Sequence, residues 1–132
     1  MKSKAKLDKI KKASANRVRR DLPQGWIIMS RAEITVSDIR DIVGDENIEV
    51  WPEVGVLEIP LGEKSSIDIE EFDTDPRDEY SCEYVAKNSI KKLFYVSFRP
   101  EDYDAAEVIL KKIASAIDGF ICGDTEDFTP HI

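Results

Sequence analysis

The sequence predicts an α+β fold, a two-layer sandwich in which two helices cover one face of a mixed, mostly antiparallel sheet. Two segments with a helical apolar stripe alternate with short segments whose apolar residues recur at every second position. The strand-like segments of 47–72 follow one another without a helix between them, which is typical of antiparallel strands. A ferredoxin-like split β-α-β arrangement with an inserted hairpin is the simplest layout, and another α+β sheet order fits nearly as well.

Length and composition indicate one folded domain. The 132 residues are 42% hydrophobic, which is enough for one buried core and too little for two ordinary domains. No apolar run approaches the ~20 residues of a membrane span, and no apolar segment follows the basic start. We therefore expect a cytoplasmic protein without a membrane partner, as a monomer or a homodimer. Cys82 and Cys122 have no CxxC spacing and are expected to be small buried side chains.

Charge divides the chain into two parts. Residues 1–20 hold nine of the 19 Lys and Arg but one of the 27 Asp and Glu, so their net charge is +8, against −16 for residues 21–132. Asp21 to Gly25 contains Pro23 and cannot continue a helix. We therefore predict a basic N-terminal arm over 1–22, helical if it docks, and an acidic α+β domain over 23–132.

The first half of the domain begins with an apolar run, 26–29, typical of a strand buried on both faces. A helix is expected next, capped by Ser30 with Glu33 or, if it starts later, by Thr35 with Asp38, and ended by Gly44. Alternation then predicts strands around 48–50, 54–59 and 66–70, the last with apolar residues on one face and acids on the other.

The second half of the domain is expected to continue with an acidic loop over 70–79, a strand over 82–87 and a hairpin turn at Asn88-Ser89. Residues 93–98 alternate as a half-buried strand, and Pro100 with two following acids suits a helix start. That helix carries an apolar stripe at spacings of three and four. We expect Gly119 to end it in a left-handed cap before a last strand, 120–122.

Catalytic and metal-binding signatures are missing from the sequence. His131 is the only histidine, and next to the end of the chain it is expected to be a free, solvated side chain. Asp73-Thr74-Asp75 begins like a calcium loop, but its sixth position is Asp78 instead of glycine. No glycine-rich phosphate loop occurs, and the many acids single out no catalytic pair. We therefore expect no enzyme activity, no cofactor and no metal.

The acidic domain favours a protein-binding function. A surface with this charge gives fast, salt-sensitive association with a basic protein, including a toxin or nuclease whose phosphate-binding cleft carboxylates can occupy. Small size, acidity and the lack of a catalytic signature are the general profile of an immunity-type inhibitor. The residues expected at this interface are Trp51, Asp68, Glu70, Glu71, Asp73, Asp75, Asp78 and Glu79.

The alternative is a nucleic-acid-associated regulatory protein that binds through its basic arm, while the body recruits a partner or dimerises. This hypothesis predicts a steep fall of affinity with salt and loss of binding when residues 1–20 are deleted. The residues expected to contact nucleic acid are Lys9, Lys11, Lys12, Arg17, Arg19 and Arg20.

Overall fold

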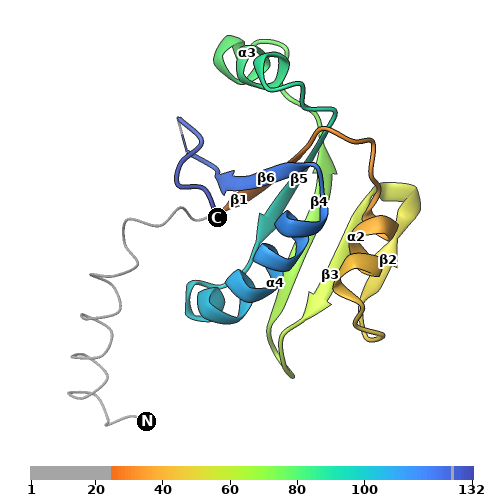
Figure 1. Ribbon diagram of the computed structural model, residues 1–132. Helices are drawn as coiled ribbons and strands as arrows, with labels where there is room; N and C mark the ends of the chain where they lie inside the picture. Colours follow the sequence, from red (N-terminus) through yellow and green to blue (C-terminus); the bar gives the residue numbers. More distant parts are fainter. Residues whose placement is uncertain (1–24, 126) are drawn as a thin grey trace, which may run out of the picture.

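A computed structural model describes residues 25–125 and 127–132 of the chain, so the expected helical arm and its boundary at residue 22 lie outside the described residues. Within these residues the fold is an α+β sandwich of six strands and three α-helices (Figure 1). The elements in chain order are β1 (Trp26–Ser30), α2 (Val36–Val43), β2 (Glu49–Trp51), the 3₁₀ turn η1 (Pro52–Val54), β3 (Val56–Pro60), β4 (Ser66–Phe72), α3 (Glu79–Lys87), β5 (Lys92–Ser97), the 3₁₀ turn η2 (Pro100–Asp102), α4 (Tyr103–Ala116) and β6 (Gly119–Gly123).

The strand order is β2-β3-β4-β5-β1-β6, and every neighbouring pair is antiparallel. The four strands β6-β1-β5-β4, with α2 and α4 as connections, have the order of the split β-α-β fold. The β2–β3 hairpin is inserted between α2 and β4 and extends the sheet at one edge. This confirms the predicted layout, with a sheet that is antiparallel throughout where a mixed one was expected.

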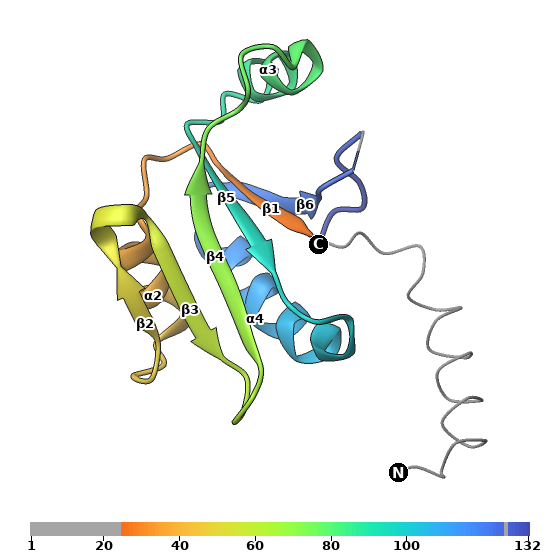
Figure 2. The same cartoon turned by 180° about the vertical axis from the view of Figure 1, so that it is seen from behind.

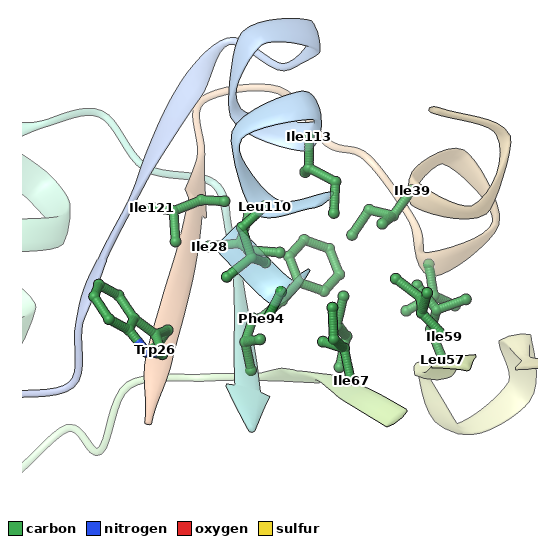
Figure 3. Packing of buried hydrophobic residues seen from close by; sticks show 14 of the residues in the cluster. Trp26, Ile28, Ile39, Leu57, Ile59, Ile67, Phe94, Leu110, Ile113 and Ile121 are labelled. Carbon is green, nitrogen blue, oxygen red and sulfur yellow. The ribbon is translucent and has the colours of Figure 1, made fainter. Parts of the chain in front are cut away.

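Helices α2 and α4 cover one face of the sheet and bury the main core there (Figures 1 and 3). Ile39 from α2 and Leu110 and Ile113 from α4 have no exposed surface. They pack against alternate residues of the strands, among them Ile28 and Phe94. Burial of these apolar side chains, each worth about 1.5–3 kcal/mol, is the main stabilisation of the two layers.

The opposite face of the sheet, which we call the open face, is covered only in part (Figure 2). Helix α3 lies beyond the ends of β4 and β5, and its Tyr84 and Val85 pack on a second apolar cluster. Phe128 from the C-terminal segment completes this cover, with its ring centroid 4.5 Å from that of Tyr84. We call the part of the open face on β5, β1 and β6 the covered half.

The two ends of α2 show which local signals the fold uses. Of the two predicted starts, the later is right: Thr35 and Asp38 form a reciprocal capping box, while Ser30 ends β1 as a buried residue. The reason is steric, because β-branched residues at 34–36 oppose an earlier helix. Gly44 ends the helix with φ of 77°, as predicted.

The strand predicted over 82–87 is wrong, because this segment is the helix α3. Asp78 accepts hydrogen bonds from the Ser81 amide and hydroxyl, which caps the helix, and the acidic loop ends there. Tyr80 and Tyr84 then meet one turn apart, with ring centroids 6.3 Å apart. Asn88 caps the C-terminus instead of forming a hairpin turn. The alternation of Cys82 and Tyr84 is therefore not strand periodicity.

The C-terminal part of the domain differs from prediction in two places. Helix α4 follows Pro100 as expected, but it ends before Gly119, which is the first residue of β6. Glycine is required there because a Cβ atom would overlap the Met29 carbonyl oxygen of β1. His131, expected to be a free, solvated side chain, is exposed, but its ring stacks on Phe120 at 5.0 Å between centroids. Its backbone forms an isolated β-bridge with Cys122 of β6.

Candidate functional site

The open face carries acidic residues on β2, β3 and β4, and this part we call the acidic half. Strand pairing places Glu49 opposite Glu58, and Glu58 opposite Asp68, in one row across the three strands. The next row joins Trp51, Val56 and Glu70 in the same way. Residues two apart in a strand share a face, so both rows point away from α2 and α4.

The three acids of the first row repel one another. Directly opposed residues in antiparallel strands have Cα atoms about 4.5–5.5 Å apart, and like charges at that position are destabilising. Within the described residues, no cation forms an ion pair with Glu49, Glu58 or Asp68. The only side-chain partner of Asp68 there is the Ser66 hydroxyl, at 3.2 Å. Among the described residues, then, nothing compensates the negative charge of the row, which a cationic partner can neutralise.

An apolar projection borders this acidic row. Trp51 is 42% exposed and Val54, in the following 3₁₀ turn, is 66% exposed. Pro52 stands between them at the first position of the turn, where its fixed φ suits the bend. An exposed tryptophan beside these carboxylates combines the residue type enriched at binding hot spots with a charged surround.

The sequence-predicted interface residues divide between several places. Trp51, Asp68 and Glu70 lie together on the acidic half. Glu71 lies on the other face, opposite Phe94, and accepts a 2.6 Å hydrogen bond from the Lys92 ammonium group. That contact raises the pKa of Lys92 above its ordinary value. Glu71 is thus already neutralised and is not part of the acidic row.

The remaining four predicted residues follow β4, at the mouth of a cavity or at the start of α3. Asp73 is exposed, and Glu79 is the first residue of α3. Hydrogen bonds from Arg77 lower the pKa of Asp75, with side-chain N–O distances of 3.2 Å. Hydrogen bonds from the Ser81 hydroxyl and amide lower the pKa of Asp78. Two of the four carboxylates are thus engaged locally.

Sequence reasoning missed Glu49, Val54, Val56 and Glu58. The sequence does hold a signal for some of them, because residues two apart in a strand point to the same face. Glu49 and Trp51 are two apart, as are Val56 and Glu58, and as are Asp68 and Glu70. The register that brings the three strands together depends on pairing between distant segments, which no local pattern specifies.

Metal binding and membrane insertion find no support in the described part of the chain. Among residues 25–125 and 127–132, no group of three His, Cys, Asp or Glu residues is placed to hold a metal ion. No helix formed by these residues is both long and apolar enough to cross a membrane.

Comparison of the chain with models of protein families, with curated proteins and with solved structures finds no match. The class that the structure defines is therefore architectural: an antiparallel α+β sandwich of the split β-α-β type with an inserted hairpin. Its function has to be inferred from the surface itself.

Proposed function

We propose that this chain is a non-enzymatic, acidic protein-binding module that docks a basic protein partner through the acidic half of its open face. The observation that carries the proposal is the row of Glu49, Glu58 and Asp68, where like charges oppose one another without a described cation between them. Such a row lowers the stability of the sheet, and a partner's lysines or arginines would relieve the repulsion on binding.

The apolar projection gives the proposed interface an anchor. Trp51 can be buried against a partner while the neighbouring acids stay at the hydrated rim, where they accelerate and orient association. An inhibitor that places carboxylates in the phosphate-binding cleft of a nuclease toxin is one form that such a module takes, and the partner class we propose is a basic protein of this kind.

A charge-reversal experiment tests this function. The partner is isolated on immobilised protein from nuclease-treated lysate at low salt, identified, purified and titrated by calorimetry. We expect the double variant Glu58→Lys/Asp68→Lys to weaken its binding by about tenfold or more, since each close charge pair contributes about 1.5 kcal/mol or more in some interfaces. The matched control Glu33→Lys/Glu46→Lys makes the same charge change at exposed positions outside the acidic half. Equal affinity of wild type and the Glu58/Asp68 variant would refute the proposal.

The alternative function belongs to the basic arm, and the charge of +8 on its residues 1–20 is the observation in its favour. A gel shift with duplex and single-stranded probes, using the full chain and a chain without residues 1–20, separates the two functions. Binding that needs the arm and falls steeply with salt would assign nucleic acid to it. Retention of the protein partner by the shortened chain would assign that partner to the acidic half.

A further inference from the structure

A cavity of about 300 Å³ lies on the open face between the sheet, α3 and the C-terminal segment. Its floor is formed by Ile27, Met29, Leu93 and Tyr95 from β1 and β5. Phe128 stands at its side and is almost completely buried. The volume is at the lower end of the range for small-molecule sites, about 300–1,000 Å³, and an apolar lining is typical of such sites.

The mouth of this cavity carries only negative charge. Asp73, Asp75, Asp78 and Asp124 line it, and Asp75 is paired with Arg77. No described Lys, Arg or His is itself part of the lining. Asp78 is engaged in capping α3, but the carboxylates of Asp73 and Asp124 have no ion pair or hydrogen bond with a described residue. A larger and more open hollow of about 880 Å³ shares Asp78 and Asp124 with this cavity and adds Asp127. An apolar floor under the carboxylates of Asp73 and Asp124 suits a ligand that is apolar at one end and cationic at the other.

The field of Asp124 reaches the cavity floor. Burial raises the pKa of Tyr95, and the nearby Asp124 carboxylate raises it further. The same two causes, in the same order, raise the pKa of Cys122 to about 12. Both shifts are in the direction that disfavours a further negative charge. The same field favours a positive charge near Tyr95.

We propose that this cavity binds a small organic amine, with its apolar body on the strands β1 and β5 and its ammonium group at Asp73 and Asp124. The site is separate from the acidic half, because Asp68 and the other acids of that row do not line the cavity. The ammonium forms charge-assisted hydrogen bonds with the two carboxylates, while the apolar body displaces water from the floor.

Titration of the full chain with phenethylamine and butylamine, followed by NMR of backbone amides and methyl groups, tests the proposal. We expect shifts confined to the cavity, including the methyl groups of Ile27, Met29 and Leu93. Affinity should fall about two- to fivefold for Asp124→Asn and about tenfold for Asp73→Asn/Asp124→Asn, the size expected when exposed ion pairs are lost. The matched control Asp68→Asn removes an acid outside the cavity and should leave amine binding unchanged.

Neutral and anionic analogues make the test decisive. We expect 2-phenylethanol to bind more weakly than phenethylamine, and 3-phenylpropanoate more weakly still. Equal binding of the amine and the alcohol would overturn the proposal, as would unchanged affinity in the Asp73/Asp124 variant, shifts outside the cavity, or no binding of either amine. Asp73 and Asp124 are exposed, so their amide variants should fold, and an unchanged amide spectrum without ligand checks this.

Discussion

The two halves of the open face are built on one continuous sheet, yet one is apolar and covered by other segments, while the other is acidic and faces solvent. On the covered half, Ile27, Met29 and Leu93 are apolar and are buried under α3 and Phe128. On the acidic half, the corresponding positions of β3 and β4 carry Glu58, Asp68 and Glu70, and these lie outside both apolar clusters. The strand register is continuous across the border, where Glu70 is opposite Tyr95.

This difference separates stability from recognition. The covered half gains free energy by removing apolar surface from water, and the acidic half forgoes that gain and adds like-charge repulsion. Beneath both halves the helix-covered face buries the main apolar core, so the domain can tolerate one costly patch. Substitutions on the covered half, the acidic half and the helix-covered face should therefore change the free energy of unfolding by different amounts and in different directions. Four predictions follow, from the largest expected effect to the smallest.

The largest difference in stability loss should appear between substitutions of two neighbouring residues on opposite faces of β4. Ile69 is fully buried and Glu70 is exposed on the acidic half. Ile69→Ala should lower the free energy of unfolding by about 4 kcal/mol, because it leaves a cavity in the core. Glu70→Ala should change it by about 0.5 kcal/mol or less, as surface substitutions do. Urea denaturation of both variants measures the contrast, and equal losses would show that the acidic half contributes to the core.

The covered half should depend on Phe128. This side chain is 6% exposed, and its ring lies against Tyr84 and stacks on Tyr80 at 5.7 Å between centroids. Phe128→Ala should lower the free energy of unfolding by about 3 kcal/mol. This is the lower end of the range for a buried phenylalanine, because Phe128 belongs to the smaller apolar cluster and keeps some contact with solvent. In this variant, amide hydrogen exchange should become faster in α3, while the strands of the sheet remain protected for longer.

A matched control comes from α4. Val108 is 69% exposed, so Val108→Ala should leave stability within about 0.5 kcal/mol of wild type. If Phe128→Ala had an equally small effect, the C-terminal segment would not stabilise the covered half, and the contrast with the acidic half would disappear.

The parts of this contrast that are local in sequence were predictable. The alternation of β4 shows an apolar face and an acidic one because successive side chains point to opposite sides, and no distant residue is needed for that inference. The position of α3 was not predictable in this way. The segment is helical because Asp78 caps it and because Tyr80 and Tyr84 make contact one turn apart. Its short apolar stretch, however, fits the spacing of a strand equally well.

The sites themselves were predictable only in part. Trp51, Asp68 and Glu70 were identified because each is a polar or aromatic residue at a strand position or strand end. Glu58 joins them only through the register of β3 with β4. The cavity depends on segments that meet only after folding: β1, β5, the stretch from the end of β4 into α3, and the residues around Phe128. No pattern within one segment indicates such a meeting, so the cavity was missed.

The like-charge row gives a prediction of opposite sign. Glu58 lies between Glu49 and Asp68, so Glu58→Lys should replace two repulsions by two attractions. We expect the free energy of unfolding to rise by about 0.2–1 kcal/mol at low salt and the gain to shrink at high salt. Thermal denaturation at two salt concentrations measures this. Glu53→Lys makes the same charge change in η1, outside the row, and a gain of the same size there would show that net charge alone is responsible.

The smallest effect concerns the pair of Glu71 with Lys92 on the helix-covered face. Here an acid has a cationic partner, which the acidic row does not have among the described residues. The hydrogen bond from Lys92 to Glu71 raises the pKa of Lys92 above its ordinary value of 10.5. A pKa that is raised in the folded state stabilises the protein fully below the unfolded pKa and loses this effect as pH rises through the folded value.

The gap in unfolding free energy between wild type and Glu71→Gln should therefore stay constant to about pH 9 and close above the ordinary lysine pKa of 10.5. We expect a gap smaller than the change produced by Glu58→Lys, because water screens a partly exposed ion pair. Denaturation along a pH series measures it, with Glu70→Gln as the control on the other face, where no pH-dependent gap is expected in this range. A Glu71→Gln gap that persists unchanged above the lysine pKa would show that the charge on Lys92 does not contribute, and that the two faces of β4 do not differ in how their acids are compensated.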